Sequence, residues 1–116
     1  MTKQRSPDGN LFSIPANSLE LSAQGELTDV LMRCEGVVVE RIVSHGHVTP
    51  PGEWYDQADD EWVLLVKGEA EITFDDGTCC RLQGGDHLMI AAGRRHRVTF
   101  TSSPAVWLAV FINPNI

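Results

Sequence analysis

Basic side chains are scarce in this chain of 116 residues, which carries 9 Lys and Arg against 16 Asp and Glu and has a formal net charge of −7. That balance argues against nucleic acids and anionic membranes as partners, because both bind positively charged surfaces. Apolar runs are also short, since none approaches the roughly 20 residues that cross a bilayer. Residues 1–10 have no apolar segment behind their positive charges and therefore do not resemble a secretory signal.

Cysteine is rare too, and the three cysteines predict no disulfide framework. Their number is odd, and Cys79 and Cys80 are adjacent, a spacing at which a disulfide is strained. No Cys-x-x-Cys pair is present to indicate a zinc site. Reduced thiols and the lack of a signal segment lead us to expect a cytoplasmic location.

Long helical patterns and internal repeats are missing as well, whereas strand patterns are abundant. Residues 69–74 alternate between apolar and polar side chains, and the Asp-Asp-Gly sequence at 75–77 is typical of a hairpin turn. Further strands are expected at residues 28–34, 37–43, 62–66, 78–82, 88–90, 97–101 and 106–112. Short strands separated by turns predict an all-β sandwich or jelly roll.

The length of the chain suits one domain with a single core. Residues 1–10 are polar and contain Pro and Gly, so we expect a mobile N-terminal tail, with the domain in residues 11–116. A short strand is expected at residues 11–14. Residues 15–25 are compatible with either a turn of helix or a loop.

Two segments of the strand-rich region each place one metal-binding side chain at a fixed distance from a glycine. Glu61 is followed by six residues and then Gly68, while Gly85 is followed by five residues, Ala-Ala-Gly, two residues and His96. Their order and spacing resemble the two motifs of the cupin family, small barrels built as a double-stranded β-helix. The resemblance covers residues 37–112. It implies a cupin-type jelly-roll barrel in which a carboxylate and an imidazole face the same interior.

The resemblance also implies a divalent metal, because the family usually holds one with three histidines and a glutamate. Glu61 and His96 match two of these ligands. Imidazole and carboxylate ligands suit Fe(II), Mn(II), Ni(II) or Zn(II) and leave positions open for a substrate or dioxygen. The second motif departs from the family at two positions, where Ala91 replaces a proline and Phe100 replaces an asparagine.

The other two histidines of the family are where this chain differs most, and two interpretations stay open. Counting back from the glutamate puts Trp54 and Asp56 at their positions. In one interpretation residues 48–60 are an insertion, and the ligands are His45, His47, Glu61 and His96. In the other, residues 54–57 lie on the motif strand, and the ligands are Asp56, Glu61 and His96, completed by His47 or Gln57.

We favour the second interpretation because it keeps the family's usual spacing. The Trp-Tyr-Asp-Gln sequence at 54–57, followed by Glu-Trp-Val, also resembles that of a group of small uncharacterised cupins. His45 and His47 would then be surface imidazoles or an added ligand.

The resemblance implies two classes of function. One is a metal-dependent dioxygenase, isomerase, lyase or decarboxylase that acts on a small organic molecule. The other is a non-catalytic module that binds a small molecule or a metal, with a degenerate metal site as its extreme form. Tyr55 is a candidate catalytic acid, and Arg94 is a candidate catalytic residue at the barrel mouth. The family resemblance further implies a homodimer.

Overall fold

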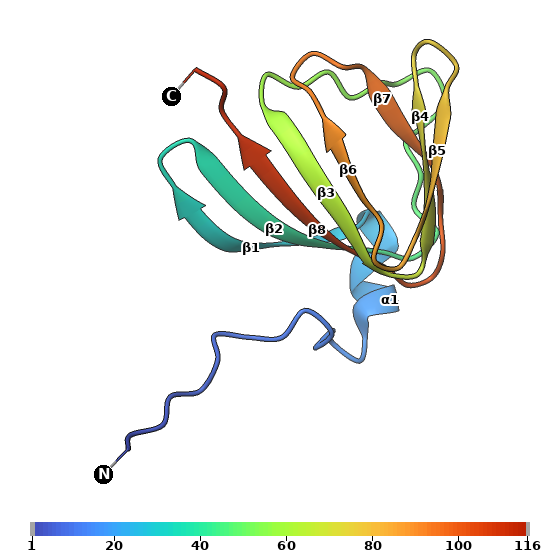
Figure 1. Cartoon of the computed structure of the whole chain (residues 1–116). Coiled ribbons are helices and arrows are strands. Elements are labelled where there is room, and N and C mark those ends of the chain that lie inside the picture. The colour runs from blue at the N-terminus through green and yellow to red at the C-terminus, as the bar shows by residue number, and fades with distance from the viewer. Residues whose placement is uncertain (1, 116) are drawn as a thin grey trace.

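Two antiparallel β-sheets face each other in the computed structural model, which describes residues 2–115 (Figure 1). The larger sheet has the strand order β1 (Leu27–Cys34), β2 (Val37–Ser44), β8 (Ala105–Ile112), β3 (Asp60–Lys67) and β6 (His87–Ile90). The smaller sheet has the order β5 (Cys79–Gln83), β4 (Glu69–Phe74) and β7 (His96–Thr101). The all-β prediction is confirmed, and every strand expected from residue 28 onwards is present.

The prediction of a strand at residues 11–14 is wrong, because these residues form turns. The Asn10 side chain accepts a hydrogen bond from the backbone N–H of Phe12 (2.8 Å), which favours a turn over an extended chain. The Ser13 carbonyl accepts a hydrogen bond from Arg41 (2.9 Å), so it does not pair with a strand. A side chain that competes for backbone groups is not visible in hydrophobic periodicity alone.

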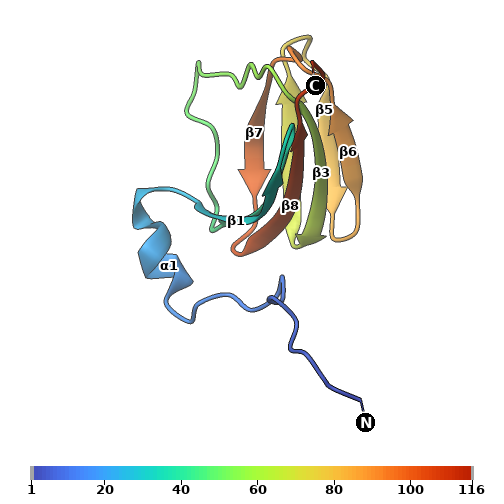
Figure 2. The ribbon, with the colours of Figure 1, turned by 90° about the vertical axis from the view of Figure 1, so that its left-hand side faces the viewer.

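A short helical segment follows, formed by α1 (Ser18–Leu21) and η1 (Ser22–Gln24), so the helical alternative is the one adopted. Residues 2–10 have no regular secondary structure and extend away from the sheets (Figure 2). Their mobility stays a prediction, and residues 1 and 116 lie outside the described residues. No helix within residues 2–115 is long and apolar enough to cross a bilayer.

The core lies between the two sheets and is built from alternate residues of the strands. β8 is the central strand of the larger sheet, because it pairs with β2 on one side and with β3 on the other. Its inward side chain Trp107 is buried, as are the residues that pack with it: Val63, Leu65, Ala70, Ile72, Leu82, Ile90 and Ala105. Burial of these side chains from both sheets holds the two layers together.

Gly68 carries the chain from β3 in the larger sheet to β4 in the smaller one. Its φ of +97° lies in a region that residues with a side chain rarely adopt. A Cβ at this position would also lie 2.7 Å from the carbonyl oxygen of Pro104 and would clash with the hydroxyl of Ser102. The glycine that ends the first motif is therefore required by the crossing between the sheets.

Candidate functional site

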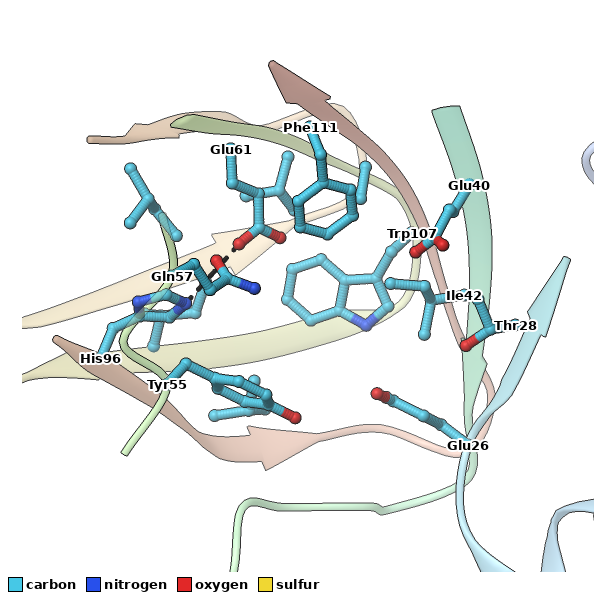
Figure 3. A pocket seen from close by; sticks show the side chains of 15 residues that line it. Glu26, Thr28, Glu40, Ile42, Tyr55, Gln57, Glu61, His96, Trp107 and Phe111 are labelled. Atoms are coloured by element: carbon cyan, nitrogen blue, oxygen red, sulfur yellow. Dashed lines mark ion pairs between the residues drawn. The ribbon is translucent and has the colours of Figure 1, made fainter. Parts of the chain in front are cut away.

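A cavity of about 210 Å³ lies between the two sheets (Figure 3). Its polar lining includes the carboxylates of Glu26, Glu40 and Glu61, the imidazole of His96 and the ring of Tyr55. Its apolar lining consists of Ile42, Val63, Ile72, Ile90, Val98, Trp107, Ala109 and Phe111. The volume is below the ~300–1,000 Å³ of most ligand pockets, so the cavity suits a compact molecule.

Glu61 and His96 form the centre of the polar lining. Glu61 lies near the start of β3 and His96 begins β7, so the two facing sheets bring them together. The carboxylate Oε1 and the imidazole Nε2 are 3.6 Å apart, and the side chains are 12% and 5% exposed. Nδ1 of His96 lies 2.8 Å from the carbonyl oxygen of Arg94 and donates its proton to it. Nε2 therefore faces Glu61 and the cavity (Figure 3).

The surroundings of His96 set its protonation. Burial alone would lower the pKa of His96, but the Glu61 carboxylate and the Arg94 carbonyl outweigh burial and raise the pKa above its usual value of 6.5. The imidazole therefore holds a second proton more readily than a solvent-exposed histidine does. A buried pair of this kind has both a proton donor and a proton acceptor within reach of the cavity.

Tyr55 and Gln57 reach the cavity from the irregular segment between β2 and β3. The backbone N–H of Tyr55 donates to the carbonyl of His96 (2.7 Å), and the N–H of His96 donates to the carbonyl of Tyr55 (3.1 Å). Directly paired residues present their side chains on the same face, and the two rings stack with their centroids 5.5 Å apart. The carbonyl of Gln57 accepts a hydrogen bond from the N–H of Gly93 (2.8 Å), which fixes this part of the segment beside the turn before β7.

This pairing moves the first motif by one residue from the favoured alignment. Asp56 is exposed and does not line the cavity, because side chains alternate along an extended chain and Tyr55 and Gln57 face inward. Trp54 lies on the other side, with its ring centroid 5.6 Å from the guanidinium carbon of Arg95. A shift of one residue exchanges the faces of every side chain, and counting along the sequence does not define the register that closely.

His45 and His47 lie outside this cavity and bind the N-terminal helical segment. The ring nitrogens of His45 lie 2.9 Å from the hydroxyls of Ser18 and Ser103. Nδ1 of His47 accepts the backbone N–H of His45, while Nε2 donates to the carbonyl of Ser22, both at 2.9 Å. The structure therefore does not bring these histidines together with Glu61, and both ring nitrogens of each are already in hydrogen bonds.

Arg94 lies outside the cavity, in the turn before β7. Its guanidinium group binds the carboxylates of Asp75 and Asp76 at 2.9 and 3.0 Å, and it lies 4.4 Å from the ring centroid of Phe74. The charge of Arg94 therefore stabilises the contact between the turn before β7 and the turn at residues 75–77. Of the two candidate catalytic side chains, Tyr55 is the one that lines the cavity.

Sequence reasoning missed two carboxylates of the lining, Glu26 and Glu40. Glu40 interrupts a run of β-branched residues in β2, and a charge at an inward position of such a strand is a signal that was available. Glu26 comes just before β1 and has no comparable signal, because its position depends on how β1 pairs with β2. Trp107 and Phe111 line the cavity from the inward face of β8.

The lining does not fit the family's metal centre of three histidines and a glutamate. Within residues 2–115, no group of three or more His, Cys, Asp or Glu side chains is placed to hold a metal ion. Glu61 and His96 are good ligands, but Tyr55 and Gln57 stand where two further ligands would be expected. A phenol and a neutral amide bind divalent metals more weakly than imidazole does, and catalytic zinc sites usually have three strong protein ligands.

Comparison with known proteins identifies the family. Residues 38–111 match the model of the Cupin domain. The chain is a cupin. No curated protein matches this cupin.

Solved structures show which cupins it is similar to. A protein of Ralstonia eutropha JMP134, provisionally named a mannose-6-phosphate isomerase, is 38% identical, with a TM-score of 0.82 over 93% of this chain and 99% of that one. A cupin superfamily protein of Desulfitobacterium hafniense DCB-2 is 23% identical, with a TM-score of 0.69 over 95% and 93% of the two chains. An RmlC-like cupin of Shewanella frigidimarina NCIMB 400 is 16% identical, with a TM-score of 0.60 over 74% of each chain. The predicted fold is thereby confirmed.

Proposed function

We propose that this cupin binds a compact organic molecule inside its barrel and exchanges a proton with it through Glu61 and His96. One observation carries the proposal. His96 has a 5% exposed side chain, one ring nitrogen is held by the Arg94 carbonyl, and the other faces the cavity beside a carboxylate. An imidazole oriented in this way and a neighbouring carboxylate are suited to general acid–base chemistry, such as moving a proton next to a carbonyl group.

The test does not require the natural substrate. A panel of small ketones and aldehydes, both neutral and amino-substituted, is incubated with the protein in D₂O, and exchange of the hydrogens next to the carbonyl is followed by NMR. We expect protein-dependent exchange in at least one compound and its loss in His96→Gln. His87→Gln is the matched control, because His87 is exposed on β6 and outside the cavity. Exchange that is absent throughout, or equal in His96→Gln, would reject the acid–base role.

The name of the Ralstonia protein raises a phosphorylated hexose as a substrate, but the cavity argues against it. Within the part of the chain that the structure describes, three carboxylates line the cavity and no Lys or Arg does. A phosphate dianion would meet like charges there, which is unfavourable. We therefore expect mannose 6-phosphate neither to raise the melting temperature nor to be isomerised. A saturable rise in melting temperature with this compound would contradict the argument.

A second candidate function is the binding of a divalent cation, Fe, Mn, Ni or Zn, by Glu61 and His96 alone. The hydrogen bond from Nδ1 of His96 to a backbone carbonyl favours it, because metal-binding histidines are usually oriented by such a partner. Calorimetric titration of the purified chain with each ion tests this candidate. Binding of one ion per chain that is at least about tenfold weaker in both Glu61→Gln and His96→Gln would support it. Equal binding in these variants would place the ion elsewhere.

We also infer that a second copy of the chain covers the outer face of the larger sheet. The strand register sets five apolar side chains in one row across all five strands: Met32, Val39, Val110, Trp62 and Met89. The two ends of the row are open to solvent, with Met32 46% and Met89 52% exposed. A continuous apolar row of this kind is typical of a protein–protein interface, and the same patch on a second copy is its simplest partner.

A further inference from the structure

We propose that the molecule bound in the barrel carries a positively charged nitrogen and that Glu26 and Glu40 bind this nitrogen. The inference rests on the proposed function, because it assumes that the barrel cavity binds an organic molecule. It adds the chemical class of that molecule, which is a compact ammonium or guanidinium compound. The two carboxylates come from the β1–β2 side of the cavity, whereas Glu61 and His96 lie on the other side of Trp107 (Figure 3).

The lining of the cavity carries an excess of negative charge. Among residues 2–115 the lining holds three carboxylates and one imidazole, which lies 3.6 Å from Glu61 and can offset the charge of that carboxylate alone. Among residues 2–115, the Glu40 side chain has no hydrogen bond or ion pair, and Glu26 accepts one hydrogen bond, from the hydroxyl of Ser44 (3.1 Å). Glu40 is half-buried and Glu26 is exposed, so the cost of a buried carboxylate without a partner falls on Glu40. A cationic ligand would supply the partner that the fold leaves out.

The inner end of the cavity is formed by His96 and Glu61. His96 is more than nine-tenths buried, and its Nε2 points into the cavity with the Glu61 oxygen at 3.6 Å as its neighbour, which is too far for a good hydrogen bond. A polar atom in that position is prepared for a further group inside the cavity. The buried Glu61–His96 pair therefore gives the site an interior end, while Glu26 is exposed at its other end.

The walls of the cavity suit a cation as well. The indole of Trp107 lies between Glu61 on one side and Glu26 and Glu40 on the other, and the ring of Tyr55 forms part of the floor (Figure 3). Aromatic faces attract ammonium and guanidinium groups, more strongly where water is excluded. Burial and the carboxylates Glu26 and Glu61 raise the pKa of Tyr55 above 10.0, so its hydroxyl stays protonated and can donate a hydrogen bond to the ligand.

One route into the cavity would pass the same carboxylate. A second, outer cavity of about 270 Å³ shares Glu26 and Tyr55 with the inner one, and His47, Thr49 and Pro50 contribute to its wall. A ligand that enters by this route meets Glu26 first. A carboxylate at the junction favours cations and repels anions during entry.

The geometry thus describes a ligand with two different ends. One end carries the charged nitrogen and lies between Glu26 and Glu40. The other end carries the group that exchanges a proton with the Glu61–His96 pair. Neutral molecules of the same shape would lack the ion pair and bind more weakly.

Matched pairs of probes test the charge directly. Choline is compared with 3,3-dimethylbutan-1-ol, which has the same shape without the charge, and guanidinium is compared with urea. Binding to the full chain is followed by ¹H–¹⁵N NMR titration. We expect each cation to shift signals of cavity residues and to bind at least about tenfold more tightly than its neutral partner.

Variants then assign the effect to the two carboxylates. Glu26→Gln combined with Glu40→Gln should weaken the binding of the cations by at least about tenfold and leave the neutral probes unchanged. The control combines Glu35→Gln with Glu69→Gln, which removes the same amount of charge from exposed positions outside the cavity. Thermal unfolding of each variant confirms that it is folded.

Two outcomes overturn the inference. Equal binding of cations and neutral partners, or equal loss in the control variant, would show that Glu26 and Glu40 do not select charge. The absence of any shift at cavity residues with all four probes would also reject a cation site. Neither outcome decides the proposed function, because the exchange of carbonyl hydrogens depends on His96 and is measured with neutral compounds as well.

Discussion

The two faces of the larger sheet are made by alternate residues of the same strands, yet they differ in chemistry. The inner face combines Glu40 and Glu61 with the aromatic walls of the cavity. The outer face carries an uninterrupted apolar row across its five strands. A soluble sheet usually has polar residues outside and apolar residues inside, so both departures need an explanation. We propose that a ligand accounts for the polar inner face and that a second copy of the chain accounts for the apolar outer face.

The largest change in the free energy of unfolding is expected for residues of the inner face that belong to the hydrophobic core. Leu65 of β3 is fully buried, and Leu65→Ala should lower the free energy of unfolding by about 2–5 kcal/mol. Its neighbour Leu64 points to the outer face and is only half-buried, so Leu64→Ala should lower it by less than half as much in the monomer. Urea denaturation of both variants at low protein concentration measures the difference. Equal losses would mean that the two faces are packed alike.

A charged residue in the middle of the apolar row tests whether the outer face forms an interface between two copies of the chain. Trp62→Glu should give a folded monomer, because a carboxylate would be buried without a partner in the interface between two copies. Sedimentation velocity measures the mass, and circular dichroism confirms the fold. Glu69→Gln serves as the control, since it changes an exposed residue of the smaller sheet. A wild-type chain that is monomeric at high concentration would contradict the role given to the row.

Substitutions at two neighbouring residues of β2 should change the free energy of unfolding in opposite directions. Glu40 faces the cavity and has no partner among residues 2–115, so Glu40→Gln should raise the free energy of unfolding by about 0.5–1 kcal/mol while weakening the binding of the ligand. Arg41 faces outward and binds both Asp29 (2.5 Å) and the Ser13 carbonyl (2.9 Å). Arg41→Met should therefore lower the free energy of unfolding by about 1–3 kcal/mol. Denaturant titration measures both, and destabilisation by Glu40→Gln would show that this carboxylate has a partner.

The smallest effect concerns Tyr55, which is the single tyrosine of the chain. Burial and the nearby carboxylates Glu26 and Glu61 raise the pKa of Tyr55 above 10.0. Glu26→Gln should lower the pKa of Tyr55 towards that value, because a like charge no longer opposes ionisation. Ultraviolet titration of the phenol follows this residue alone. An ordinary pKa in the folded protein, unchanged in Glu26→Gln, would place the phenol outside the influence of these carboxylates.

The strands and the second motif were predictable from the sequence, because they depend on local alternation and on fixed spacing. His96 follows Gly93 at a short distance in one turn, so few registers are open to it. The first motif was harder, because residues 45–59 are irregular and the inward positions depend on the bridge between Tyr55 and His96. That contact joins residues far apart in the sequence. Periodicity alone therefore could not decide whether Asp56 or Gln57 faces inward, because the two choices differ by only one residue in the register.

The carboxylates of the β1–β2 side could not be assigned for a different reason. Which strands line the cavity follows from the sheet order β1-β2-β8-β3-β6, which places chain segments from both ends of the domain side by side. Glu26 joins the lining only through the pairing of β1 with β2. No local pattern carries that information, since it is a property of the whole fold.

The state of His96 tests the central claim most directly, and long-range ¹H–¹⁵N NMR of the four imidazoles measures it. We predict that Nδ1 of His96 keeps its proton as the pH rises through neutrality, while Nε2 titrates with a pKa above 6.5. In Glu61→Gln the pKa of His96 should fall below that value, because burial is then opposed only by the Arg94 carbonyl. An Nδ1 that carries no proton in the neutral imidazole, or a pKa of His96 that is the same in Glu61→Gln, would contradict the acid–base pair on which the proposed function rests.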